Sequence, residues 1–114
     1  MSDKRPSSLA VLKARASVFA ALGDETRLTV LSKLLSGEPQ SISRLTEGTD
    51  LTRQAVSKHL RVLEDAGVVR SERAGRETLF ELEAKSIDDA RAFLDRIARQ
   101  WDDALVRLKA FVEK

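Results

Sequence analysis

The sequence predicts a mainly α-helical fold with one small β-hairpin, and three observations support this fold class. Apolar residues recur every three or four positions through most of the chain, in segments that often end at a glycine. Near residue 80, apolar and polar residues alternate, which is typical of a strand. Helical spacing then returns for about 25 residues. With 114 residues, the chain is expected to form a flexible arm over 1–8 and a single domain over 9–114.

Two helices are predicted in the first third of the chain. The first covers 9–22, where apolar residues gather on one side, and Gly23 interrupts it. The second covers 25–36 and is rich in leucine. Gly37 and Pro39 are expected to end it, because neither residue readily continues a helix.

A short helix and a longer one follow, joined by only three residues. The short helix covers 41–48 with Ser41 as its cap, and the long helix runs from Thr52 to Gly67. The hydroxyl of Thr52 can accept a hydrogen bond from a free backbone N–H, and Gly67 can adopt the left-handed conformation common at helix ends. Two helices with so short a connection near a glycine are typical of a helix-turn-helix, here expected over 41–67.

The long helix has two different sides. One side is apolar and carries Val56, Leu60 and Leu63. The other carries hydrogen-bonding and cationic groups, and such a helix fits the DNA major groove, where arginine and lysine pair with guanine and glutamine with adenine. The candidate base-contacting residues are Arg53, Gln54, Ser57 and Lys58.

A basic β-hairpin is predicted over 68–82, with its turn at Gly75 and Arg76. Phe80 and Leu82 alternate with Glu81 in the second strand. Arginines along the hairpin give it a cationic rim that can reach DNA phosphates. The candidate phosphate-contacting residues are Thr52, His59, Arg61, Arg70, Arg73 and Arg76.

His59 is the only histidine, and it has two interpretations. By helical angle it lies beside Val56 and Leu63, which favours a partly buried, hydrogen-bonded side chain over a base contact. A phosphate contact is the alternative. No catalytic residue is predicted, because no second histidine is present and the nearest serines do not face His59 on a helix.

Two segments resemble signatures of one family. Residues 19–31, FAALGDETRLTVL, resemble the opening signature of the ArsR/SmtB winged helix-turn-helix repressors, and residues 57–69, SKHLRVLEDAGVV, resemble their recognition-helix signature. The similar region runs from about residue 19 to residue 82, in the order and spacing of the family. The resemblance implies a dimeric transcriptional repressor whose partners are double-stranded DNA and a second copy of the chain. It leaves the effector open.

The last segment, 86–113, predicts a long helix that starts at a capping box formed by Ser86 and Asp89. A helix of about 25 residues would be close to 38 Å long at 1.5 Å per residue, which exceeds what a core of this size can cover. Paired with the first helix, it is expected to form a two-fold interface with a second copy. The alternative is a lone helix folded back on the core. The expected interface residues are Leu12, Phe19, Leu94, Ile97, Trp101, Leu105 and Leu108.

Composition limits the other function classes. The net charge is only +2, but residues 53–61 hold three basic and no acidic side chains, as phosphate binding requires. The absence of cysteine excludes disulfides and thiolate metal sites. Members of the family that sense metals place cysteines before the recognition helix, or aspartate–histidine pairs on the last helix, and this chain has neither. No metal and no cofactor are therefore expected.

Two further interpretations concern the cellular location of the protein and its function class. No apolar run approaches the roughly 20 residues that span a bilayer, so a cytoplasmic protein without membrane contact is expected. A protein-interaction module that keeps the same fold without binding DNA is the alternative function. Acidic residues in place of basic ones on the long helix would favour it, and residues 53–61 contain none.

Overall fold

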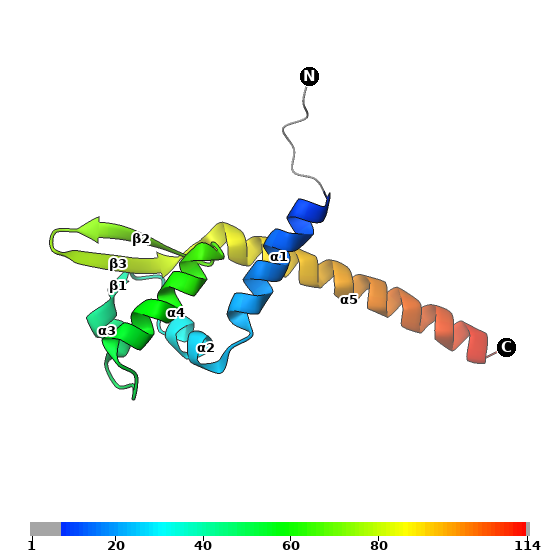
Figure 1. Ribbon diagram of the computed structural model, residues 1–114. Helices are drawn as coiled ribbons and strands as arrows, with labels where there is room; N and C mark the ends of the chain where they lie inside the picture. The colour runs from blue at the N-terminus through cyan, green and yellow to red at the C-terminus, as the bar shows by residue number, and fades with distance from the viewer. Residues whose placement is uncertain (1–7, 114) are drawn as a thin grey trace, which may run out of the picture.

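A computed structural model describes residues 8–113 of the protein as a helical body from which a β-hairpin projects on one side and a long helix on the other (Figure 1). The helices are α1 (Ser8–Leu22), α2 (Glu25–Ser32), α3 (Ile42–Thr46), α4 (Arg53–Asp65) and α5 (Ala84–Val112). The strands are β1 (Gln40–Ser41), β2 (Val69–Ala74) and β3 (Glu77–Leu82). This mainly α-helical fold with a hairpin confirms the predicted fold class. The predicted arm over 1–8 lies outside the described residues except for Ser8, which already belongs to α1.

The core lies where α4 packs against α2 and α3 and reaches the sheet. The buried side of α4 carries Val56, Leu60 and Leu63, all fully shielded from solvent. Leu45 of α3 and Leu34, just after α2, are equally buried. The apolar side of α4 that the sequence predicts is therefore the face that anchors this helix in the molecule.

Local hydrogen bonds fix where the helices begin. The Ala55 amide donates to the hydroxyl of Thr52 (3.0 Å), and the Arg44 amide donates to the hydroxyl of Ser41 (3.2 Å). Both predicted caps are confirmed. At α2, the Arg27 amide donates to Asp24 (2.9 Å), and this bond is the main cause that lowers the pKa of that half-buried carboxyl. Satisfying otherwise free N–H groups in this way is what makes these residues good caps.

The sheet has the strand order β1-β3-β2 and is antiparallel throughout. In the hairpin, Val69 lies opposite Leu82 and Ala74 opposite Glu77. The turn contains Gly75 with a positive φ of 64°, a conformation that residues with a Cβ rarely adopt. The predicted hairpin is confirmed. The additional strand β1 was not predicted, since two residues are too few to show a periodicity.

Two predicted helix boundaries are wrong. Helix α2 ends at Ser32 rather than residue 36, because Leu34 and Leu35 form tighter i→i−3 bonds to the carbonyls of Leu31 and Ser32. Helix α5 begins at Ala84, and its N-cap residue makes no side-chain hydrogen bond.

The capping box predicted at Ser86 does not form. Instead of capping α5, the Ser86 hydroxyl donates to the carbonyl of Gly67, at the end of α4. This bond ties the start of α5 to the end of α4 across 19 positions of sequence. No helix within residues 8–113 combines the length and the apolar character needed to cross a membrane.

Candidate nucleic-acid interface

The outward side of α4 carries the candidate base-contacting residues. Arg53, Gln54 and Lys58 are exposed, and Ser57 is half-buried. Within the described residues, none of these four side chains makes a hydrogen bond or an ion pair with another part of the chain. Their donors and acceptors are therefore available to a ligand. The opposite side of α4 is buried in the core, so the helix presents these groups from a fixed support.

The connection between α3 and α4 is held by its own hydrogen bonds. The Thr49 hydroxyl donates to the carbonyl of Thr46 (2.6 Å) and accepts a bond from the amide of Leu51 (3.2 Å). Gly48, with a φ of 75°, allows the chain to leave α3. These contacts fix the angle between the two helices of the predicted helix-turn-helix.

The hairpin holds three arginines in different situations. Arg73 and Arg76 are exposed, and the Arg73 side chain bonds only the carbonyl of Gly75 in its own turn (3.2 Å). Arg70 instead pairs with Glu81 on the neighbouring strand, with an N···O distance of 2.7 Å. The hydrogen bond to Glu81 raises the pKa of Arg70. The positive charge of Arg70 is therefore partly compensated, whereas Arg73 and Arg76 keep theirs available for phosphate.

Replacing Arg73 and Arg76 with alanine is expected to weaken binding to all DNA sequences alike. Each lost phosphate contact should make the plot of log affinity against log salt shallower by roughly one unit, because one fewer counterion is released. Fluorescence anisotropy titrations between about 50 and 300 mM salt measure this slope. Arg99→Ala removes an exposed positive charge from α5, outside the proposed DNA-contacting residues, and is the control for loss of charge. An unchanged slope in the hairpin variant would show that the hairpin does not touch DNA.

His59 is half-buried on the inner edge of α4, as the first of its two interpretations predicts. It lies near Asp24, and its charge contributes, as a minor cause, to the lowered pKa of that carboxyl. The hydrogen bond expected for the imidazole is not present among residues 8–113. His59 thus lies between α4 and the corner before α2. A phosphate contact by His59 stays a prediction.

Two other cations near the interface were not among the predicted site residues. Arg44 is exposed on α3, which packs against α4. Lys33 is half-buried, and its ammonium donates to the carbonyl of Glu47 at the end of α3. A lone arginine in the helix before the long one was the available signal for Arg44. Lys33 has a structural role that only the folded chain reveals.

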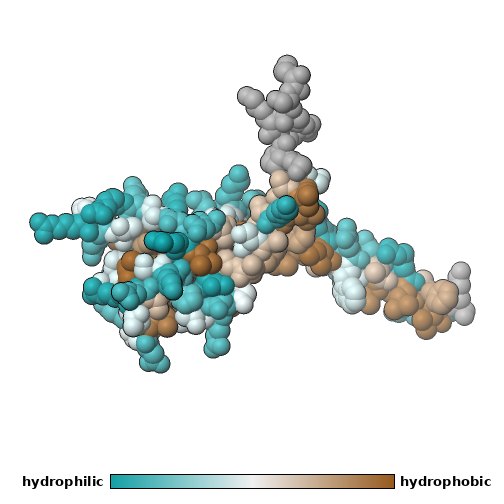
Figure 2. Space-filling view, in the orientation of Figure 1, coloured by the Kyte–Doolittle hydropathy of each residue, from teal (hydrophilic) through white to brown (hydrophobic). Residues whose placement is uncertain are grey.

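The apolar surface expected at the dimer contact is exposed in the single chain. Trp101 is 65% exposed, and Ala90 is the only buried residue of α5 among those described. Phe19 is half-buried against Phe93, with ring centroids 5.9 Å apart. The exposed apolar residues follow the length of α5, as Figure 2 shows in brown. The alternative of a lone helix folded back on the core is therefore wrong. The other predicted contact residues, all exposed, are Leu12, Leu94, Ile97, Leu105 and Leu108.

Known proteins of similar sequence and structure agree with this geometry. A family model for a helix-turn-helix domain matches residues 13–72. The transcriptional repressor SmtB of Mycobacterium tuberculosis is 30% identical over 100 residues, which span 88% of this chain and 72% of that protein. An ArsR-like transcriptional regulator from Rhodococcus sp. RHA1 superposes with a TM-score of 0.77 at 37% identity, over 89% of this chain and 94% of that one. The chain belongs to the ArsR/SmtB family.

This ArsR/SmtB protein is a DNA-binding transcriptional regulator, as its sequence predicts. A winged helix-turn-helix domain from Mycobacterium bovis shares the fold at 21% identity, with a TM-score of 0.67 over 88% of this chain and 92% of that one. In these terms α3 and α4 form the helix-turn-helix, and β2 with β3 forms the wing. The family and the fold are those of transcription regulators rather than enzymes.

Residues that could hold a metal are dispersed. Within residues 8–113, no group of three or more histidine, cysteine, aspartate or glutamate side chains lies close enough together to bind an ion. The carboxylates of α5 include Asp88, Asp95 and Asp102, which are exposed and spread along the helix. Carboxylates in general suit hard cations rather than zinc or copper.

Proposed function

We propose that the protein is a dimeric transcriptional repressor that binds an inverted-repeat operator through α4 and the wing. The observation that carries this proposal is the free outward side of α4, whose arginine, glutamine and lysine have no partner elsewhere in residues 8–113. Polar groups that project from a buried, capped helix match the hydrogen-bonding pattern of base edges in a major groove.

The proposed residues divide into two classes. Arg53, Gln54, Ser57 and Lys58 contact base edges and so determine sequence preference. Phosphate contacts come from α4, its N-cap and the hairpin. They fix the orientation of the protein on DNA and supply most of the salt-dependent affinity. The proposed phosphate contacts are Thr52, His59, Arg61, Arg70, Arg73 and Arg76.

The dimer is proposed from α5 and α1. Helix α5 has 29 residues and is therefore about 44 Å long, yet it buries a single residue among those described. An exposed apolar stripe of this extent is unusual for a monomer and marks an interface. The Mycobacterium bovis domain of the same fold is described as homodimeric, which supports a two-fold pairing here. Repression follows if the dimer covers a promoter, as the name of the SmtB relative suggests.

Selection of bound sequences from a random DNA pool tests the proposal. We expect an inverted repeat whose half-sites lie about one helical turn, or 10–10.5 base pairs, apart, because a two-fold dimer presents two recognition helices in opposite directions. Footprinting then gives the length of the protected site. Enrichment of a single, non-repeated half-site would contradict the dimer, and no enrichment would favour the protein-interaction module.

Metal ions are not expected to regulate this binding. Chelators should leave operator affinity unchanged, and stoichiometric zinc, cadmium or arsenite should not release the DNA. The reason is the ligand set: the chain has no cysteine and one histidine, which is half-buried on α4. Equilibrium dialysis with zinc measures this directly. A stoichiometric zinc complex with altered operator affinity would show that the expected ligand set is incomplete.

The proposal also covers the cellular location of the protein and whether it is an enzyme. Chromosomal DNA lies in the cytoplasm of bacteria and archaea, the organisms of the similar proteins, so a cytoplasmic place of action is proposed for this regulator. No catalytic role is proposed for any residue. The hydroxyls of Ser41, Thr49 and Thr52 serve as helix caps or backbone contacts instead of pairing with His59.

A further inference from the structure

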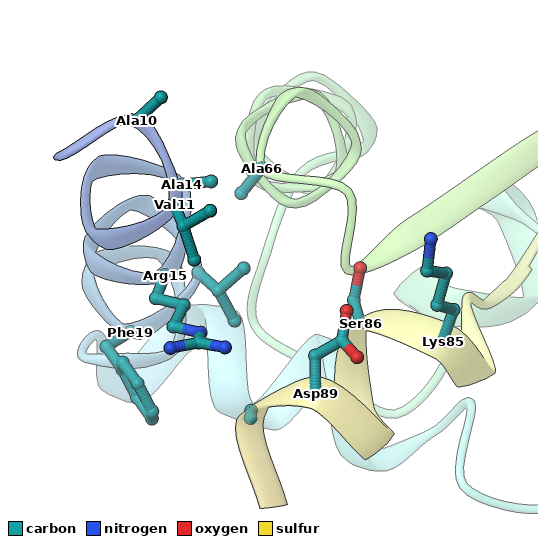
Figure 3. Close-up of a pocket in the computed structure, with 11 residues that line it drawn as sticks. Ala10, Val11, Ala14, Arg15, Phe19, Ala66, Lys85, Ser86 and Asp89 are labelled. Carbon is teal, nitrogen blue, oxygen red and sulfur yellow. The ribbon is translucent and has the colours of Figure 1, made fainter. Parts of the chain in front are cut away.

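A cavity of about 430 Å³ lies between α1, the end of α4 and the start of α5. Figure 3 shows α1 on one side, Ala66 above, and Ser86 and Asp89 on the first turns of α5 opposite. Its volume falls within the range of pockets that bind small molecules, about 300–1,000 Å³. Mostly small side chains leave the space open, and the apolar lining consists of Ala10, Val11, Ala14, Val18, Phe19, Ala66 and Ala90.

Opposite charges face each other across this cavity. Arg15 is half-buried and extends from α1 toward α5, and Asp89 extends from α5 into the same space (Figure 3). Neither side chain has an ion-pair or hydrogen-bond partner in the part of the chain that is described. Arg15 lies over the Phe93 ring, with its guanidinium carbon 5.1 Å from the ring centroid. Arg15 is partly desolvated, and such a charge is stabilised when an opposite charge reaches it, whereas Asp89 is exposed.

We propose that this cavity binds a small zwitterion with an apolar body, the chemical class of the apolar α-amino acids. Arg15 would hold the carboxylate, Asp89 the ammonium group, and the alanine and valine wall the side chain. Lys85 also lines the cavity, so a simple cation would leave Arg15 and Lys85 unmatched and a simple anion would leave Asp89 unmatched. Only a ligand that carries both charges matches both ends of the cavity.

The cavity adjoins the proposed dimer surface at Phe19, which belongs to both, and its other lining residues lie outside the two surfaces already assigned. On α1, the lining residues Ala14, Arg15 and Val18 lie on the side that faces α4 and α5, whereas Leu12 points to the exposed apolar side. The candidate DNA-contacting residues are at the other end and on the other side of α4. A ligand here would not compete with DNA.

The position of the cavity connects it to DNA binding. Ala66 is the C-cap residue of α4, and the carbonyl of Gly67 accepts the bond from Ser86 at the start of α5. A bound zwitterion would therefore bridge α1 and α5, the proposed dimer helices, beside the end of the recognition helix. This inference deepens the regulation of the proposed repressor and rests on that function, but ligand binding itself can be measured without DNA.

Isothermal titration calorimetry on the full-length protein tests the site. The probes are L-leucine and L-phenylalanine, with two analogues of leucine: 4-methylpentanoate, which lacks the amine, and 3-methylbutylamine, which lacks the carboxylate. We expect saturable binding of an amino acid with one site per chain, and affinity roughly tenfold or more above that of either analogue, since each loses one charge-assisted contact. Absence of saturable binding by both amino acids, or equal affinity of an analogue, would overturn the proposal.

Matched variants locate the binding. Arg15→Gln and Asp89→Asn should each weaken binding by about tenfold or more. Lys13→Gln and Asp88→Asn remove the same charges from neighbouring exposed positions outside the cavity and should leave binding unchanged. Equal effects of a variant and its control would overturn the assignment.

Two further measurements separate this site from the proposed function. Ala14→Phe should fill the cavity and abolish ligand binding, and Ala14 is exposed enough that circular dichroism and the melting temperature should remain near those of the wild type. In saturating amino acid, operator affinity of the wild type should change by on the order of fivefold or more, and that of Ala14→Phe should not. Ligand binding without any DNA binding would contradict the proposed function alone. Operator binding without ligand binding would contradict only the cavity assignment.

Discussion

Trp101→Ala is expected to convert the protein to a monomer at low micromolar concentration and to abolish high-affinity operator binding. Trp101 lies midway along the exposed apolar stripe of α5 and is 65% exposed in the single chain. Truncating a tryptophan at a packed centre typically costs about 3–5 kcal/mol. At a two-fold contact the loss occurs in both subunits. The recognition helix is untouched, so any loss of operator binding comes from loss of the paired arrangement.

Sedimentation equilibrium measures this change. Because Trp101 contributes to none of the buried core, the variant should keep its helical circular dichroism spectrum. Trp101→Phe retains an aromatic side chain and should remain dimeric, and Arg99→Ala, an exposed neighbour on the same helix, should behave as the wild type. A fully dimeric Trp101→Ala protein, or a wild type that is already monomeric, would show that α5 is not the dimer contact.

The features that the sequence predicted correctly depend on short stretches of chain. The caps at Ser41 and Thr52 involve amides only three positions away. The two sides of α4 follow from helical spacing within 13 residues. The exposure of α5 followed from length alone, because a helix longer than the core must leave part of its apolar stripe uncovered. Local rules and simple dimensions are sufficient for such features.

The features that were missed depend on residues far apart in the sequence. Ser86 donates to Gly67 rather than capping its own helix, and that choice requires the relative placement of α4 and α5. The Arg70–Glu81 pair depends on the register of the hairpin, which places those two residues directly opposite. The cavity beside Arg15 has the same origin, since its walls come from three helices. Helical periodicity carries no information about how separate elements meet.

The candidate DNA-contacting residues could be predicted from the sequence only in part. Periodicity correctly places Gln54 and Lys58 on the side of α4 that faces away from the core, and the structure leaves both exposed. Which base each one reads depends on the depth and angle of α4 in the groove. Those quantities belong to the complex, so the division between base and phosphate contacts is a prediction that variants must test.

Gln54→Ala and Lys58→Ala are each expected to relax base preference at particular operator positions. A good base contact discriminates by about 1–3 kcal/mol, or roughly five- to 150-fold, so affinity for the preferred sequence should fall by that factor while binding to random DNA changes little. Neither side chain has a partner in the described part of the chain, so its truncation leaves no buried group unpaired. The fold should therefore be unaffected.

Competition binding against a set of operators with single base-pair changes measures the loss position by position. For a residue that reads a base, truncation removes the penalty for changing that base pair and leaves the penalties at other positions intact. Arg61→Ala, a proposed phosphate contact on the same helix, is the matched comparison and should lower affinity for all sequences by a similar factor. If Lys58→Ala shows the uniform loss expected of Arg61→Ala, Lys58 contacts the DNA backbone. If neither α4 variant changes any penalty, the outward side of α4 does not enter the groove, and the proposed mode of operator recognition is wrong.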